Sequence, residues 1–137
     1  MTNPIHDCLI NNNTNIKPVW FMRQAGRYLP EFRKIRKLNP NFIKLCLNEN
    51  LSSKITLQPL ERFELDAAII FSDILMLPYG LNQKVIFRKN FGPELGPIDL
   101  DKISRVDEIY FLEKLLPIYK AIKKVKKNPL VKNKDLI

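Results

Sequence analysis

The chain of 137 residues is short of the residue types that usually carry metal or redox chemistry. It holds a single histidine, His6, and two cysteines, Cys8 and Cys46. These three residues match no metal-ligand or disulfide spacing, so we expect both thiols to be free and reduced, and no metal site. Chemistry at a functional site must then come from other side chains.

Long apolar runs are lacking as well. No segment approaches the ~20 consecutive apolar residues of a membrane span, and residues 1–15 have neither the basic start nor the apolar stretch of a signal peptide. We therefore expect a cytoplasmic protein with no membrane partner. An apolar content of 45% argues against disorder, and the length suits one domain, residues 1–137.

Acidic residues are few, 14 against 23 basic ones, which gives a net charge of +9. Most of this charge comes from a span without any acidic residue: Lys120, Lys123, Lys124, Lys126, Lys127, Lys132 and Lys134. A solvated helix face is the simplest interpretation. The alternative is a small basic nucleic-acid-binding protein, but no stacking aromatic residues alternate with these lysines, so we expect no nucleic-acid partner.

Arginine is scarcer than lysine, seven against sixteen, yet four arginines fall in the segment PVWFMRQAGRYLPEFRKIR, residues 18–36. They are Arg23, Arg27, Arg33 and Arg36. A guanidinium group can grip a carboxylate or phosphate through two parallel hydrogen bonds. A solvated helix face is the simpler alternative for arginines four residues apart. However, Gly26 separates Arg23 from Arg27, and the apolar run Val19 to Met22 precedes them, so we interpret the segment as a buried strand that ends in an anion clamp.

A second apolar run, Ala67 to Phe71, has the length of a strand and no polar alternation, which is typical of a parallel strand buried on both faces. It ends in Ser72 and Asp73. Asp73 is a candidate functional carboxylate at this strand end; the alternatives are a helix N-cap before Ile74 or an ion pair with a clamp arginine.

Helical patterns lie between the two predicted strands, which gives the order of a βαβ unit. We expect helices over residues 30–38 and 42–47, and a third that is capped by Ser52 or Ser53, ends near Phe63 and is kinked or broken at Pro59.

Weaker patterns follow Asp73. We expect a loop or short helix over residues 74–82, a short strand over 83–88, turns in FGPELGP (91–97) and weak helical character over 101–116. A helix should begin with Pro117 in its first turn and end near Lys127, and Leu136-Ile137 should open another strand. Alternating β and α segments imply a doubly wound sheet or a closed (β/α)8 barrel, and a barrel needs ~250 residues.

Two long segments carry a resemblance to a known family. PVWFMRQAGRYLPEFRKIR and TLQPLERFELDAAIIFSDIL, in this order and at this distance, resemble the two signatures near the N-terminus of the uroporphyrinogen decarboxylase family. The similarity runs from about Ile16 to the end of the sequence and is weakest over residues 82–110. It implies an α/β fold that is the N-terminal portion of a (β/α)8 TIM barrel, incomplete before the third strand is finished.

The resemblance also implies an activity. Members of this family are carboxy-lyases that decarboxylate the four acetate side chains of uroporphyrinogen III to give coproporphyrinogen III in haem biosynthesis, without metal or organic cofactor and usually as homodimers. A later tyrosine, serine and histidine of the family have no counterpart here. We therefore expect either a partner supplied by a separately encoded C-terminal half, or an inactive fragment. A related cobalamin-dependent methyltransferase barrel is disfavoured by the RQAGRY loop and the lack of Cys/His spacing.

Residue roles follow from the same resemblance. The implied substrate-binding residues are Arg23, Gln24, Ala25, Gly26, Arg27, Arg36 and Asp73, with Asp73 and Arg23 in catalytic roles. The arginines suit the substrate carboxylates, and Asp73 suits the pyrrole N–H groups and the cationic ring that forms when a pyrrole carbon is protonated. An arginine is the candidate proton donor, although guanidinium groups stay protonated near neutral pH.

Overall fold

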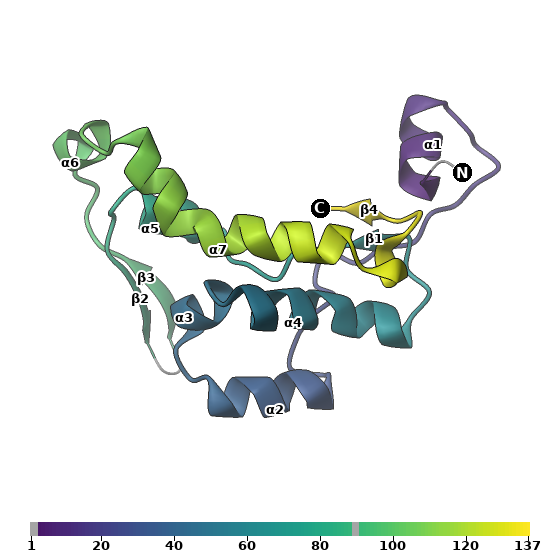
Figure 1. Ribbon diagram of the computed structural model, residues 1–137, viewed down its shortest axis with the longest axis horizontal. Helices are drawn as coiled ribbons and strands as arrows, with labels where there is room; N and C mark the ends of the chain where they lie inside the picture. The colour runs from purple at the N-terminus through teal and green to yellow at the C-terminus, as the bar shows by residue number, and fades with distance from the viewer. Residues whose placement is uncertain (1–2, 89–90) are drawn as a thin grey trace.

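The computed structural model describes residues 3–88 and 91–137 and shows a mixed helical and strand fold (Figure 1). The elements in chain order are α1 (Pro4–Ile10), α2 (Pro30–Leu38), α3 (Phe42–Cys46), α4 (Glu49–Arg62), β1 (Ala67–Ala68), α5 (Met76–Gly80), β2 (Val85–Arg88), β3 (Gly92–Leu95), α6 (Leu100–Ser104), α7 (Glu108–Lys126), the 3-10 helix η1 (Pro129–Val131) and β4 (Asp135–Leu136).

The strands β1 and β4 form a parallel pair, in which Ala67 lies opposite Asp135 and Ala68 opposite Leu136. Main-chain hydrogen bonds extend the pairing, since the N–H of Ile70 donates to the carbonyl of Ile137 over 2.8 Å. Ala67 and Ala68 are fully buried. The prediction of a buried parallel strand and of a new strand at the end of the sequence is confirmed, although β1 spans only Ala67 and Ala68 of the five predicted residues.

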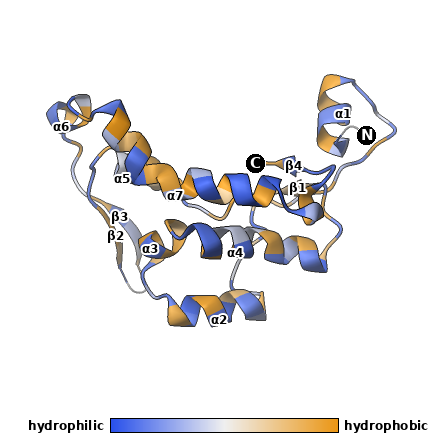
Figure 2. Cartoon of the chain, viewed as in Figure 1, coloured by the Kyte–Doolittle hydropathy of each residue, from blue (hydrophilic) through white to orange (hydrophobic). Residues whose placement is uncertain are grey.

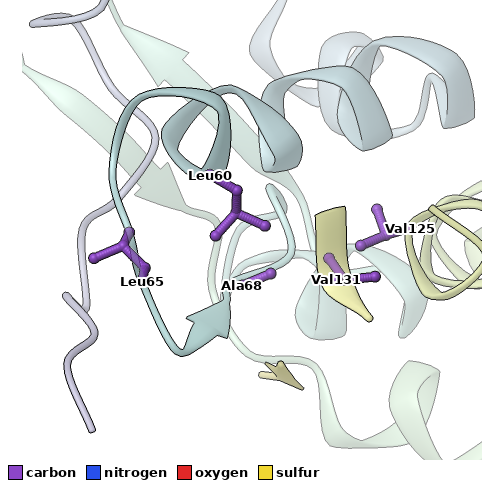
Figure 3. Close-up of a cluster of buried hydrophobic side chains, with 5 residues drawn as sticks. All are labelled: Leu60, Leu65, Ala68, Val125 and Val131. Atoms are coloured by element: carbon purple, nitrogen blue, oxygen red, sulfur yellow. The ribbon is translucent and has the colours of Figure 1, made fainter. Parts of the chain in front are cut away.

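The helices α4 and α7 lie side by side and cover the small parallel sheet (Figure 1). A core cluster joins them to β1: Leu60 of α4, Leu65, Ala68, Val125 of α7 and Val131 converge in Figure 3. At the other end of α4, the Nζ atom of Lys124 lies 2.7 Å from Oε1 of Glu49. The observed βαβ unit is β1–α7–β4. The unit that the sequence predicts, with Val19 to Met22 as its first strand, is wrong, because these residues form no strand.

A second core cluster joins α2 to α4 and to the residues after β1. Leu29, Phe32, Leu45 and Ile55 are its buried members, and Ala25 and Phe71 pack against it. The exposed residues of α2 include Arg33, Lys34 and Lys37, and Figure 2 shows hydrophilic and hydrophobic residues alternating along this helix. The helix predicted over residues 30–38 is confirmed, and its burial of Phe32 brings the arginine segment against the end of β1.

The strand predicted over Val19 to Met22 is wrong. These residues adopt no regular structure, and their side chains are between 40% and 77% exposed. A single main-chain hydrogen bond, from the N–H of Asp66 to the carbonyl of Val19, joins them to the chain before β1, and the Asp66 carboxylate takes up the Val19 N–H. One ladder bond does not make a strand, because pairing must repeat along both chains.

Two predicted helix starts are also wrong. The cap of α4 is Asn48, whose Oδ1 accepts hydrogen bonds from the N–H groups of residues 50 and 51, and Ser52 and Ser53 lie inside the helix. The helix α7 begins at Glu108 behind the capping Asp107, so Pro117 lies in its interior. Both internal prolines, Pro59 and Pro117, are accommodated without ending a helix, and α7 changes direction along its length in Figure 1.

Between α5 and α6 the chain makes an antiparallel hairpin. The strand predicted over residues 83–88 is confirmed as β2, whose Val85 lies opposite Leu95 of β3. The segment predicted as turns, FGPELGP, supplies β3 instead, because Gly92 adopts a positive φ of 83° at the start of the returning strand. Residues 89 and 90, between the two strands, lie outside the described residues.

Candidate functional site

The loop from Arg23 to Leu29 is fastened to β1 by Gln24. The Gln24 side chain is 3% exposed, and its Nε2 donates a 2.9 Å hydrogen bond to the carbonyl of Ala67. The hydroxyl of Tyr28 donates a hydrogen bond to the main-chain carbonyl of Gln24. The N–H of Leu29 donates a 3.1 Å hydrogen bond to the main-chain carbonyl of Gly26. These bonds give the RQAGRY sequence a defined shape directly beside the buried strand.

One polar atom of this loop stays unpaired. Oε1 of Gln24 is buried and accepts no hydrogen bond from any residue that the structure describes. A buried amide oxygen without a partner is costly in free energy. Gln24 therefore combines a structural hydrogen bond to β1 with a buried acceptor that has no partner among the described residues. Gly26 shows no steric need for glycine, because an added Cβ would lie 3.7 Å from the nearest atom, in the Tyr28 ring.

The exposed guanidinium groups gather on the outside of the loop and of α2. A groove of about 240 Å³ is lined by Arg27, Phe32, Arg33, Arg36 and Lys37. Four of its five lining residues are cationic, and none is acidic. Such a surface favours a carboxylate or phosphate ligand. Arg23 is exposed and does not line this groove.

Arg33 supports the groove through the main chain. Its Nη1 atom donates to the carbonyl of Arg27 over 2.7 Å and to that of Tyr28 over 3.1 Å. The hydrogen bonds fix the backbone that carries the Arg27 side chain. The sequence prediction counted Arg33 in the arginine cluster but gave it no role at the site, and only the geometry reveals it as a positioning residue.

Arg36 is held from two sides. Its Nη1 donates to the Asn39 carbonyl over 2.6 Å, and its guanidinium carbon lies 5.5 Å from the centroid of the Phe42 ring. Stacking on an aromatic face orients a guanidinium group and leaves the remaining N–H groups to other acceptors. Arg36 is thus preorganised toward the groove that Arg27 also lines.

Asp73 lies in the turn that leads from β1 into α5. Its Oδ1 accepts a 2.8 Å hydrogen bond from the N–H of Leu75. The main-chain carbonyl of Asp73 accepts a second hydrogen bond, from the N–H of Met76. The helix-capping alternative is wrong, because the N-cap of α5 is Leu75 and no side chain caps this helix; Asp73 instead closes a turn through the N–H of Leu75. Its other carboxylate oxygen accepts no hydrogen bond from the described residues, and within residues 3–88 and 91–137 no ion pair joins Asp73 to an arginine.

The pKa of the Cys46 thiol depends on the charges of both Asp73 and Arg36. Burial, and to a smaller extent the negative charge of Asp73, raise the pKa of Cys46 to about 12, and the positive charge of Arg36 acts in the opposite direction. Ala25 and Phe71 both pack against the cluster that includes Leu45 of α3, so the loop and the chain that leads to Asp73 approach the same helix.

The end of β1 is held by α4 and by a series of aromatic contacts. The Ser52 hydroxyl donates to the carbonyl of Phe71 over 2.6 Å, and the Thr56 hydroxyl accepts from the Phe71 N–H over 2.8 Å. The Phe71 ring contacts Phe32 at 5.6 Å and Phe42 at 5.8 Å between centroids. Phe71 therefore connects the groove side of α2 to the chain that carries Asp73.

The lysines near the C-terminus have local partners. Lys124 pairs with Glu49, and Nζ of Lys134 donates to the carbonyl of Leu65. These contacts bind the lysine-rich segment to α4 and to the chain before β1. They account for part of the positive charge without a nucleic acid.

Two searches over the described parts of the chain give negative results. In residues 3–88 and 91–137, no three His, Cys, Asp or Glu side chains lie together in a way that could hold a metal ion. None of the helices described is both long and apolar enough to span a lipid bilayer.

Comparison with known proteins identifies relatives. A uroporphyrinogen decarboxylase of Agrobacterium fabrum is 46% identical over 109 residues, which are 80% of this chain and 32% of the relative. Those of Rickettsia massiliae and Rickettsia canadensis are 46% and 48% identical over 118 residues, 86% of this chain and 34% and 35% of theirs. The chain thus spans about a third of the length of these relatives. The family model of uroporphyrinogen decarboxylase (URO-D) matches residues 3–134, and the chain belongs to this family.

Proposed function

We propose that the chain forms the N-terminal part of a uroporphyrinogen decarboxylase barrel and supplies its substrate-binding arginines. The observation that carries the proposal is the cationic groove lined by Arg27, Phe32 and Arg36, whose Phe32 ring contacts that of Phe71, two residues before Asp73. The substrate, uroporphyrinogen III, carries eight carboxylates, and such a groove offers several guanidinium groups to them. The remaining two-thirds of the barrel comes from the rest of the family domain.

The arginines hold and orient the substrate in this proposal. Arg27 and Arg36 bind carboxylates in the groove, and Arg23, exposed at the start of the loop, binds another. Gln24, Ala25 and Gly26 form the loop that presents them, and the Gln24 side chain fastens this loop to β1. A polyanion bound in this way places one acetate group at a time near Asp73.

Asp73 acts on the macrocycle. Its unpaired carboxylate oxygen accepts hydrogen bonds from pyrrole N–H groups. Protonation of a pyrrole carbon next to an acetate group gives a cationic ring, the bond between the acetate methylene and its carboxylate breaks, and its electrons neutralise the ring as carbon dioxide leaves. A fixed carboxylate beside this cation lowers the barrier, an effect typically worth ~3–4 kcal/mol. Arg23 is the proposed proton donor.

The assembly and location follow the family. The partner of this chain is either a second copy in a homodimer or a separately encoded C-terminal half, and the enzyme works in the cytoplasm without a cofactor. The inactive-fragment alternative differs in one respect only: the groove would exist, but no barrel would close around it.

The test is turnover by a reconstituted enzyme in which residues 1–137 replace the matching third of the Rickettsia massiliae relative. We expect Asp73→Ala to lower the rate of coproporphyrinogen formation about 100- to 1,000-fold and Arg27→Ala to lower it severely, with folding unchanged. Lys54→Ala, an exposed charge on α4, should have no effect. Near-normal turnover of the Asp73 and Arg27 variants would refute the roles proposed here, and an inactive parent chimera would favour the inactive fragment.

A further inference from the structure

The helix α7 carries two apolar faces, and one of them packs against the rest of the described chain. Leu115, Ala121 and Val125 are buried against the rest of the chain. A second set comprises Ile109, Leu112, Leu116 and Tyr119, hereafter the outer stripe. None of its members belongs to any of the three core clusters.

The outer stripe has the spacing of a helix-packing seam. Its residues follow one another at intervals of three, four and three, which places them in one row along a helix. They are between 39% and 67% exposed, and with Glu113 and Lys123 they line a groove of about 500 Å³. A row of large apolar side chains around a groove is the surface that a second helix covers by fitting its ridges between them.

The position of α7 in the fold indicates which helix would cover the outer stripe. α4 precedes β1 and contacts α7 through Glu49, which pairs with Lys124 and Lys120. α7 follows β1 and leads to β4, which lies parallel to β1. In a right-handed series of parallel β/α units, each helix packs beside the one before it. The helix that follows β4 would therefore lie beside α7 on a flank that α4 does not occupy.

The length of the relatives indicates which part of the family domain covers the outer stripe. This chain spans about a third of them, so the family domain contains further β/α units beyond β4. We propose that the outer stripe is the docking surface for the next helix of the barrel, which belongs to the remaining two-thirds of the domain. That helix carries a matching apolar stripe, flanked by a basic residue opposite Glu113 and an acidic residue opposite Lys123. The proposal rests on the barrel fold proposed above and not on the decarboxylation chemistry.

The test is co-expression of the chain with the C-terminal two-thirds of the Rickettsia massiliae relative, with affinity purification through a tag on residues 1–137. The wild-type chain should co-purify the C-terminal part in equal amount. Leu116→Glu should lower the recovered partner at least about tenfold, because it places a charge in the apolar seam. The matched control is Leu95→Glu in β3, since Leu95 and Leu116 have nearly equal exposure, 45% and 44%. This control should leave recovery within about twofold.

A second measurement covers the case in which Leu116→Glu does not fold. A photo-crosslinking amino acid at position 112 should form crosslinks to a single helix of the C-terminal part, located by mass spectrometry. Equal recovery with Leu116→Glu and Leu95→Glu, no co-purification by the wild-type chain, or crosslinks only between two copies of this chain would each overturn the proposal. Binding is measured without turnover, so Arg27→Ala should remain bound even though the proposed function predicts that it is inactive.

Discussion

The hydroxyl of Thr56 accepts a 2.8 Å hydrogen bond from the main-chain N–H of Phe71. The same hydroxyl donates to the Ser52 carbonyl over 2.8 Å, so that one side chain bridges the inside of α4 and the chain just after β1. Asp73 lies two residues beyond Phe71. The position of the candidate carboxylate thus depends on a helix 15 residues earlier in the sequence.

Replacing Thr56 with valine tests this bond. Thr56→Val keeps the shape of the side chain but leaves the Phe71 N–H without its acceptor, which should cost about 1–3 kcal/mol of unfolding free energy. The measurement is urea denaturation followed by circular dichroism. Ser53→Ala is the control, because the Ser53 hydroxyl bonds only to carbonyls of its own helix. We expect the control to change stability by less than about 0.5 kcal/mol, and equal losses in both variants would count against the bridge.

Gly80 tests the packing of α5 on α7. A Cβ at this position would lie 2.6 Å from Cε2 of Phe111 and 3.1 Å from Cδ1 of Leu115. Gly80→Ala should therefore force the Phe111 ring to move and destabilise the fold by about 1–3 kcal/mol. Gly26→Ala, where the nearest atom is 3.7 Å away, should fold normally in the same thermal melt. A Gly80→Ala protein as stable as the parent would mean that α5 and α7 are packed more loosely than described.

The two cysteines should differ in reactivity. Cys46 is fully buried with its pKa raised to about 12, whereas Cys8 is partly exposed. A thiol reagent at pH 8 should label Cys8 rapidly and Cys46 only when urea unfolds the chain, because the thiolate is the reactive species. The Cys8→Ser variant keeps Cys46 as its single thiol, so the slow labelling of Cys46 can be measured alone. Rapid labelling of Cys46 in folded protein would show that α3 does not cover it.

The ion pair between α2 and α4 should give a pH-dependent contribution to stability. The Glu31 carboxylate accepts hydrogen bonds from Nε and Nη2 of Arg62 at 2.6 and 2.9 Å, and these bonds hold the pKa of Glu31 below its usual 4.5. Because the folded pKa is the lower one, the stabilisation is present above pH 4.5 and is lost as the pH falls through the folded value. Arg62→Gln should thus be less stable than the parent at pH 7 in urea titrations, and this difference should shrink as the pH falls below 4.5 and through the lower folded pKa of Glu31. A difference that stays constant as the pH falls would mean that it does not come from the ionised Glu31–Arg62 pair.

The parts of the fold that the sequence predicted correctly have strong local signals. Pro30 at a helix start, the apolar residues 67–71 and Leu136-Ile137 gave α2, β1 and β4 near their observed positions. The α/β class follows from them. The barrel itself stays a prediction, because two parallel strands do not close a sheet.

The errors arise where long-range packing outweighs a local pattern. Val19 to Met22 are apolar in sequence but have only one main-chain bond to a neighbouring segment, so burial could not be inferred from composition. Pro117 looked like a first-turn proline, yet Asp107 caps a longer helix whose buried residues lie on both sides of it. The arginines could be predicted as a cluster, but which of them share a groove depends on the curvature of the loop. The roles assigned to Arg23 and Asp73 stay predictions.

The claim that the arginine groove receives the substrate is tested most directly by an equilibrium binding measurement. The ligand is uroporphyrin, the oxidised form of the substrate, which keeps all eight carboxylates, and the protein is the reconstituted enzyme with Arg27→Gln and Arg36→Gln together. Two lost charged hydrogen bonds of about 1.5–3 kcal/mol each should weaken binding at least about 100-fold. Lys54→Gln with Lys127→Gln removes the same charge elsewhere and should change the dissociation constant less than about twofold. Equal weakening by both double variants would contradict the claim, because it would show that only net charge attracts the ligand.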